Sequence, residues 1–168
     1  MTHSTAAALG IALAAMPLLA GEPAPVPAQI LTSKKVFLSN AGVDATSFGI
    51  LSQAGDIIDP FNRIYAALKS AGRFDLVGAP SDAELVFEVR FATRYDNCKA
   101  EPDLRFWPQP PSYYESQLVV TVLDARTHFI LWTLEEPLGV PRTKGNWSKS
   151  LDQAVAHLVG GLKNLAGS

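Results

Sequence analysis

The sequence predicts a single α+β domain in which two helices pack on one face of a mainly antiparallel sheet of four or five strands. Three observations support this fold class. Segments with strand-type alternation and segments with helix-type spacing follow one another in the order β-α-β-β-β-β-α. Consecutive strands flanked by helices favour an α+β arrangement. The chain has 168 residues, of which 48% are hydrophobic, and this is enough for one well-packed core.

Residues 1–28 are interpreted as a signal peptide with a Pro-rich tether, and residues 29–168 as the folded domain. Ala6–Ala20 is an apolar run that is shorter than a membrane-spanning helix. Cleavage is expected after Ala20 or after Ala28, and the alternative is a disordered N-terminus. Glu22 stands where a bacterial lipoprotein would carry its lipid-bearing cysteine, so no stable membrane anchor is expected. The predicted location is periplasmic or secreted.

The first half of the domain contains a strand, a long loop, a helix and a second strand. Asp59 can cap the helix, Pro60 suits its first position, and Gly72 ends it. Alternation and turn residues place the other elements, which are a strand at 34–39, a loop at 40–55, a strand at 74–77 and a turn at 78–82.

The second half contains three strands and the final helix. Apolar and charged residues alternate through 84–95, which indicates a half-buried strand. The hairpin arms 117–123 and 128–135 are apolar at nearly every position, so we expect both to lie centrally in the sheet. The final helix is expected at about 147–166. Gly160 and Gly161 interrupt it, each at a cost of about 1 kcal/mol unless a strand approaches closely there.

Three segments carry a resemblance to a known family: Ala67–Val77, Ser81–Val86, and Leu123–Thr127 leading into Leu131–Thr133. They form a helix with its following strand, a second strand, and an Asp-x-x-Thr hairpin that ends near a tryptophan. This pattern resembles small bacterial envelope α/β domains, such as the amino-terminal domain of TolB and related outer-membrane-associated proteins, over residues 34–165. The resemblance implies partner binding rather than catalysis. The family's lipid-attachment cysteine and propeller repeats do not occur in this sequence, so the partner stays unassigned.

Charge and residue spacing argue against several function classes. The formal net charge is −2, from 14 basic and 16 acidic residues that are interspersed, so neither nucleic acid nor an anionic membrane is expected as the main partner. His3, His128 and His157 have no cysteine or carboxylate at ligand spacing, and no metal site is predicted. Cys98, the only cysteine, is interpreted as an incidental thiol rather than a redox centre.

No catalytic residue and no cofactor are predicted, and the protein is interpreted as a non-enzyme. The serine-nucleophile signatures Gly-x-Ser-x-Gly and Ser-x-x-Lys do not occur in the sequence. Residues 139–145 lack the Gly-Lys-Ser/Thr order of a phosphate loop. Asp56 and Asp59 could form an acid–base pair, although helix capping explains them better. Ser150 and Gln153 likewise fit a capping box in the final helix.

The loop 97–114 is the strongest candidate contact site. Phe106, Trp107, Tyr113 and Tyr114 stand among four prolines, and rigid aromatic side chains are efficient anchors at interfaces. The alternative is that the loop folds back and covers one end of the sheet.

The predicted function is binding of another cell-envelope component, a protein, through this loop or through an open sheet edge. Arg142 and Lys144 are either solvated loop charges or contacts for an acidic partner. Two alternatives stay open: a small hydrolase whose titratable groups converge in one deep pocket, and a structural module that oligomerises through sheet edges. The oligomeric state and the partner's identity are left open.

Overall fold

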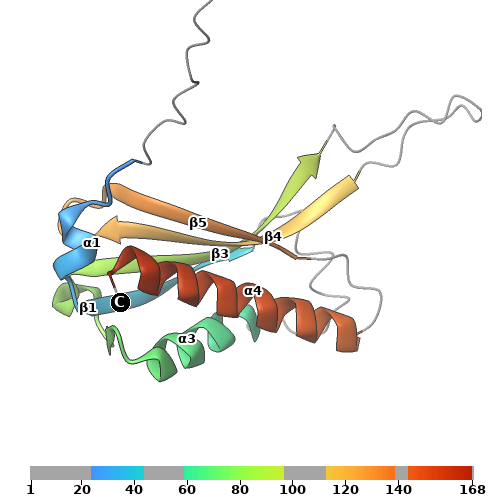
Figure 1. Ribbon diagram of the computed structural model, residues 1–168, viewed down its shortest axis with the longest axis horizontal. Helices are drawn as coiled ribbons and strands as arrows, with labels where there is room; N and C mark the ends of the chain where they lie inside the picture. Colours follow the sequence, from blue (N-terminus) through green and yellow to red (C-terminus); the bar gives the residue numbers. More distant parts are fainter. Residues whose placement is uncertain (1–23, 44–58, 97–112, 139–143, 168) are drawn as a thin grey trace, which may run out of the picture.

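The computed structural model describes residues 24–43, 59–96, 113–138 and 144–167 (Figure 1). They form a five-stranded sheet with the strand order β2-β1-β3-β4-β5. Helices α3 and α4 lie on one face of this sheet. The elements in chain order are α1 (Ala28–Thr32), β1 (Lys35–Val43), α3 (Asp59–Ala71), β2 (Asp75–Val77), the 3-10 turn η1 (Pro80–Asp82), β3 (Leu85–Asp96), β4 (Tyr113–Asp124), β5 (Ile130–Leu138) and α4 (Lys144–Leu165).

The predicted α+β fold with two helices on one face is confirmed. In detail the sheet is mixed. β3 pairs with β4, and β4 with β5, in antiparallel register, whereas β1 is parallel to both of its neighbours, β2 and β3. The parallel pairs arise because the chain leaves β1, returns along the sheet through α3, and enters β2 in the same direction.

The core lies between the sheet and the two large helices. Alternate residues of β3, from Leu85 to Phe91, point toward the helices and are buried, as the alternation in the sequence predicted. Phe74 meets Phe87 edge to face, with 5.1 Å between the ring centroids. Side chains from the other elements complete the core, among them Val36, Leu38, Ile64, Leu68, Leu118, Val120, Val122, Leu151, Leu158 and Leu162.

Helix α3 lies where the sequence placed it. Pro60 stands in its first turn, and Gly72 follows its last residue directly. Gly72 has a φ of +65°, in the left-handed region that glycine adopts without strain. The helix therefore ends at this glycine and the chain turns into β2.

Arg73 joins three segments that are far apart in the sequence. Its guanidinium donates hydrogen bonds to the carbonyl oxygens of Ser33 at 3.2 Å, Leu31 at 3.0 Å and Ala166 at 3.3 Å. The guanidinium carbon also lies 5.0 Å from the centroid of the Phe74 ring. The end of α1 and the end of α4 are thus both attached to Arg73, the second residue after α3.

Helix α4 begins at Lys144 rather than at about Trp147. Ser150 and Gln153 consequently lie inside the helix, and the capping box predicted for them is wrong, because a cap must precede the first turn. Trp147 is buried, and its ring meets that of Phe91 with 5.8 Å between the centroids. This contact anchors the first turns of α4 on β3.

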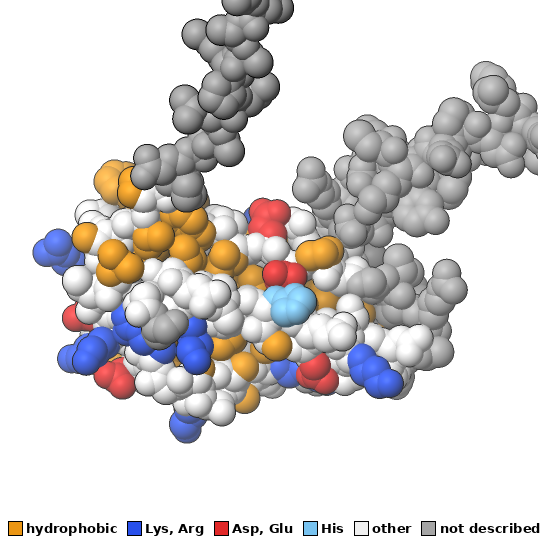
Figure 2. All heavy atoms as spheres, in the orientation of Figure 1, with side chains coloured by type: hydrophobic (Ala, Val, Ile, Leu, Met, Phe, Trp, Pro, Cys, Tyr) orange, Lys and Arg blue, Asp and Glu red, His pale blue; other side chains and the backbone are white. Residues whose placement is uncertain are grey.

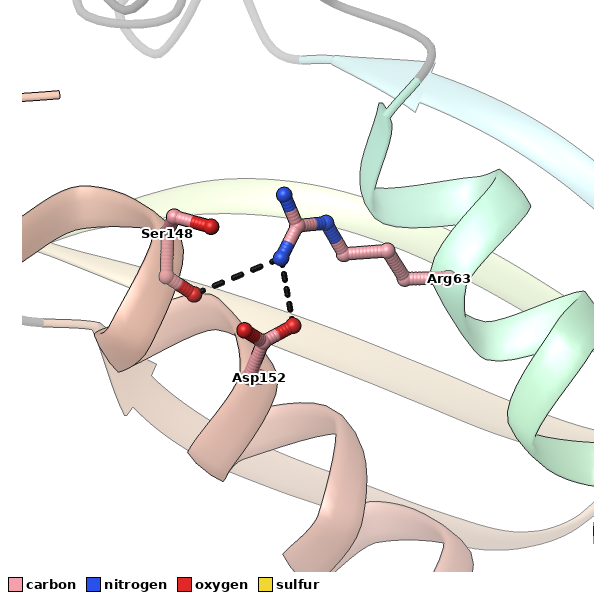
Figure 3. A network of polar contacts seen from close by, with 3 residues as sticks. All are labelled: Arg63, Ser148 and Asp152. Carbon is pink, nitrogen blue, oxygen red and sulfur yellow. Dashed lines mark hydrogen bonds and ion pairs between the residues drawn. The ribbon is translucent and has the colours of Figure 1, made fainter. Parts of the chain in front are cut away.

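An ion pair joins the two large helices at their outer side (Figure 3). Arg63 of α3 points toward α4, where its Nη1 donates to Oδ1 of Asp152 and, at 3.4 Å, to the carbonyl oxygen of Ser148. The Asp152 side chain is largely exposed, so the pair contributes only about 0–1 kcal/mol to stability. The buried apolar contacts beneath it hold most of the helix pair together.

The paired glycines of α4 differ in what lies beside them. A Cβ added to Gly161 would lie 3.4 Å from Cδ1 of Leu134 in β5, whereas a Cβ added to Gly160 would have nothing within 4 Å. The expected close approach of a strand is therefore confirmed at Gly161. Gly160 has no packing reason among the described residues.

Two strands extend further than the sequence predicted. β1 continues to Val43, past a bulge between Asn40 and Gly42, so the start of the expected 40–55 loop belongs to the sheet. β4 begins at Tyr113, so Tyr113 and Tyr114 lie in the strand and not in the loop 97–114. Backbone pairing with β3 extends both strands, and such pairing leaves no apolar alternation in the sequence.

Candidate functional site

The predicted binding residues are not brought together in the described part of the chain. Phe106, Trp107 and Arg142 lie outside the described residues. Tyr113 and Tyr114 are the first residues of β4, and Lys144 is the first residue of α4; for these three the backbone alone is described. Their role in binding stays a prediction, and the candidate site comes instead from β5.

β5 lies at an edge of the sheet, so the prediction that both hairpin arms are central is wrong for this arm. β4 has neighbours on both sides, but β5 pairs with β4 alone within the described ranges. The misassignment has a physical cause. Apolar side chains report what covers the two faces of a strand, and they do not report whether its outer backbone edge is paired. One signal was available: Pro137 lies within β5, and proline inside a sheet is confined mainly to edge strands.

Two hydrogen bonds establish whether the backbone N–H and C=O groups of each residue in β4 point toward β3 or toward β5. The N–H of Asp124 donates to the carbonyl oxygen of Phe129 at 3.0 Å, toward β5. The N–H of Ala125 donates to the carbonyl oxygen of Glu84 at 3.1 Å, toward β3. Because these directions alternate along a strand, even-numbered residues of β4 bond to β5 and odd-numbered residues bond to β3.

The same alternation shows which residues of β5 have backbone N–H and C=O groups that point away from β4. Val120 of β4 pairs with Leu134, and the register shifts by one residue at Leu131, so from Trp132 onward the even-numbered residues of β5 face β4. The N–H and C=O groups of Thr133 and Glu135 therefore point outward. Pro137 also lies at an outward-facing position. Its missing N–H is tolerated there because an N–H at this position would point away from β4. The outer edge thus offers a short row of backbone donors and acceptors that ends at Pro137.

Apolar side chains gather at the start of this edge. Phe129 and Ile130 are 72% and 66% exposed, and further along the strand Trp132 and Leu134 are half-buried against the core. Leu31 of α1, 45% exposed, lies at the same end of the molecule (Figure 1). Figure 2 shows hydrophobic side chains gathered on the side that carries α1 and β5. Because exposed apolar surface is typical of interaction sites, this part of the molecule is the candidate site.

One carboxylate holds the turn that precedes β5. Oδ1 of Asp124 accepts hydrogen bonds from the N–H of Thr127 at 2.8 Å, from the Thr127 hydroxyl at 3.0 Å and from the N–H of Arg126 at 2.9 Å. These bonds, those from Thr127 first, hold the pKa of Asp124 below its ordinary value. His128 then takes a φ of +58°, which is uncommon outside glycine, and the chain enters β5.

Glu84 fixes the start of β1 in a similar way. Its Oε2 accepts hydrogen bonds from the N–H groups of Lys34 at 2.7 Å and Lys35 at 3.1 Å, and these bonds lower the pKa of Glu84. Glu84 and Asp124 are therefore both ionised and bound to backbone amides at neutral pH. They hold the chain in place and have no proton to donate, so neither fits a general acid.

A small pocket lies at the other end of β1, beside the first turn of α3. Its volume is about 50 Å³, and it is lined by Asn40, Gly42, Val43, Pro60, Phe61, Val89, Phe91 and Leu118. No titratable side chain is among these residues, and Oδ1 of Asn40 already accepts a hydrogen bond from the N–H of Gly42 at 2.9 Å. The converging titratable groups that a hydrolase needs are not present in this pocket.

No metal centre is found within the described ranges, since no three His, Cys, Asp or Glu side chains there come close enough to hold an ion. His157 of α4 instead lies 3.3 Å from a carboxylate oxygen of Glu136 in β5, in an exposed contact. Cys98 lies outside the described residues. None of the helices in this part of the chain has the length and apolar character needed to cross a membrane.

Comparison with known proteins gives likeness at the level of the fold. No family model matches this chain, and no curated protein matches its sequence. One similar solved structure is the PelC dodecamer from Paraburkholderia phytofirmans, with 15% identity and a TM-score of 0.40 over 83% of this chain and 93% of that chain. Another is an uncharacterized lipoprotein B from Nitrosomonas europaea, with 11% identity and a TM-score of 0.40 over 77% and 81% of the two chains.

A minor lipoprotein from Acinetobacter baumannii is also similar, with 13% identity and a TM-score of 0.35 over 82% of this chain and 95% of that chain. Bacterial lipoproteins thus stand among the proteins of similar fold, at low identity. The resemblance to the TolB amino-terminal domain stays a prediction from the sequence.

Proposed function

We propose that the protein is an exported, non-enzymatic module of the bacterial cell envelope that binds another protein by strand addition at the outer edge of β5. One observation carries this proposal: the outer backbone edge of β5 pairs with no strand in the described part of the chain, and the apolar side chains of Trp132 and Leu134 lie half-buried beside it. Proteins usually protect such an edge, and an exposed one is a template for a further strand.

An added strand would be recognised in two ways. Its backbone would bond to the outward N–H and C=O groups of Thr133 and Glu135, which supplies affinity without regard to sequence. Its alternate side chains would pack beside Trp132 and Leu134 on the helix side of the sheet, and this selects partners with apolar residues at every second position. The negative charges of Glu135 and Glu136 disfavour an acidic partner next to them.

The envelope location rests on the sequence. The apolar run Ala6–Ala20 has the character of an export signal, and the resemblance to TolB-type domains points to the same compartment. The loop 97–114, with Trp107 and Tyr113, is proposed as a second contact region for the same partner.

Site-specific photo-crosslinking in living cells tests this proposal. A photo-reactive amino acid placed at Thr133 on the β5 edge should form covalent adducts with another protein, whereas the same group at Asn62, exposed on α3, should form none at those masses. Adding Thr133→Pro to a bait whose photo-reactive group is at Glu135 should remove the adducts. Equal adducts with and without Thr133→Pro would show that strand addition at β5 is not the binding mode.

The loop is tested separately. Trp107→Ala and Tyr113→Ala baits are compared with the wild type in pull-downs from the envelope fraction. Loss of the partner that is crosslinked at Thr133 would support the loop as a second contact, and unchanged capture would remove it.

A further inference from the structure

We propose that the strand added to β5 is β5 of a second copy of this chain, in antiparallel orientation about a two-fold axis at Thr133. This inference rests on the proposed function, because it names the partner of the same edge. The two sheets would then form one continuous ten-stranded sheet, given the five strands of each copy.

The sheet has two edges, and they differ in their capacity to pair. At one edge, β2 is only three residues long. At the other, β5 has nine residues and carries its exposed apolar side chains in the first half. Two features that protect an edge occur in β5: a proline with adjacent acidic residues at Glu135–Pro137, and a register shift in the pairing with β4 at Leu131. The regular stretch around Thr133, between these two features, is therefore the part of the sheet edge that is open to another strand.

Symmetry and backbone parity leave few registers. In an antiparallel pair of two β5 strands, residues whose backbone groups point outward must lie opposite one another. The two-fold axis therefore passes through Thr133, through Glu135, or through an even-numbered residue such as Leu134. An axis at Glu135 sets two carboxylates directly opposite each other, which is destabilising, and places Pro137 where a donor is required. An axis at Leu134 moves the carboxylates only two residues apart along the strand.

An axis at Thr133 removes the repulsion. The two Glu135 side chains are then four residues apart along the strand direction, roughly 14 Å at about 3.4 Å per residue. This exceeds the screening length of about 10 Å at moderate salt. The acidic half of each copy, Glu135 and Glu136, lies toward the turn of the other copy, which carries Arg126 and the ionised Asp124. The two Glu135 carboxylates are thus well separated in this register and directly opposed in the register at Glu135.

The side chains are self-complementary in the same register. Trp132 of one copy faces Leu134 of the other, and the reverse contact follows by symmetry. Both residues are half-buried in the single chain and lie on the helix side, next to the core. On the opposite face Thr133 meets its own copy, and threonine pairs are favourable across strands.

Sedimentation of the protein purified after export tests the self-association. A strand-only interface lies at or below the lower size limit of about 1,200 Å² for stable complexes, so the mass should rise toward twice the monomer value only as concentration increases from about 1 µM to about 500 µM. Thr133→Pro removes the two N–H donors on the axis and should weaken the dimer about thirtyfold. Thr133→Val keeps these donors and should dimerise as the wild type does. A wild type that stays monomeric at the highest concentration would overturn the proposal.

The register is tested by disulfide trapping in a Cys98→Ser background. Thr133→Cys should give a covalent dimer on mild oxidation, because residues opposite each other in this pair have Cα atoms about 5.5 Å apart, within the range that a disulfide spans. Glu135→Cys is the matched control and should stay monomeric. Efficient trapping by Glu135→Cys without trapping by Thr133→Cys would overturn the axis at Thr133.

The same measurements separate this inference from the proposed function. If the edge binds a different protein, the adducts formed from Thr133 in cells have a mass other than twice that of this chain, and the purified protein stays monomeric. That result refutes self-pairing and leaves strand addition in place. Absence of any adduct, together with a monomer, refutes both.

Discussion

Two adjacent glycines in α4 give the sharpest test of how this helix packs on the strand at the candidate site. Glycine inside a helix costs about 1 kcal/mol relative to alanine. A methyl group at Gly160 would have nothing within 4 Å, so Gly160→Ala should stabilise the fold by about the full 1 kcal/mol. A methyl group at Gly161 would lie 3.4 Å from Cδ1 and 3.6 Å from Cδ2 of Leu134, at the near limit of ordinary contact. Because the new methyl group and Leu134 would be at the closest distance of ordinary contact, with no room to spare, Gly161→Ala should gain about half as much.

Urea unfolding followed by circular dichroism measures both differences. For a domain of this size, Gly160→Ala should also raise Tm by about 3 °C. Leu134→Ala supplies the control: it removes the side chain that opposes the methyl group, so Gly161→Ala made in that background should recover the full gain of about 1 kcal/mol. The reasoning is refuted if Gly161→Ala stabilises more than Gly160→Ala in the wild-type background, or if the gain at Gly161 is unaffected by Leu134→Ala.

Three further predictions follow from contacts at the end of the sheet near α1. Arg73→Leu leaves three carbonyl oxygens without their donor and should lower the free energy of unfolding in urea by about 2 kcal/mol. An unchanged free energy of unfolding would show that Arg73 does not hold these three segments together. Asp124 has a lowered pKa, so its stabilising contribution is present above its ordinary pKa of 3.8 and is lost as the pH falls through the lower folded pKa. Asp124→Asn should therefore be less stable than the wild type at about pH 7 and show a smaller loss on acidification to about pH 3; parallel pH profiles would refute this. Val26 packs against the core, so a chain that lacks residues 1–28 should be less stable by about 1 kcal/mol than one that lacks residues 1–20, and equal unfolding midpoints would contradict it.

The structure bears differently on the two alternatives to a binding module, a small hydrolase and a structural module that oligomerises through sheet edges. A hydrolase needs titratable groups converging in a pocket, and the pocket beside α3 has an apolar lining with one amide side chain that is already bonded. Oligomerisation through a sheet edge needs an unpaired strand with apolar side chains, and β5 provides one. Pairing with a second copy of the chain is therefore one form of the strand addition proposed for this edge, and the mass of the crosslinked adduct distinguishes it from binding of a different protein.

Local signals in the sequence determined the elements and the face that each one buries. Alternation in 84–95 correctly assigned the buried face of β3, and Pro60 and Gly72 correctly bounded α3. These inferences succeed because side-chain burial and helix ends depend on residues that are close together in the chain. The start of α4 was misjudged because Lys144 and Gly145 carry no capping signal, and the buried contact between Trp147 and Phe91 stabilises those first turns.

Only the tertiary structure decided the order of the strands, and with it the candidate site. The sequence shows that β5 is apolar at nearly every position, but its place at the edge follows from the path of the whole chain: β1 pairs with β3 and not with the outer side of β5, so β5 pairs with β4 alone within the described ranges. The parallel pairing of β1 with its neighbours was likewise set by the return of the chain through α3. Pairing joins residues that are distant in sequence through backbone groups that every residue shares, so it leaves little trace in the identity of the residues themselves.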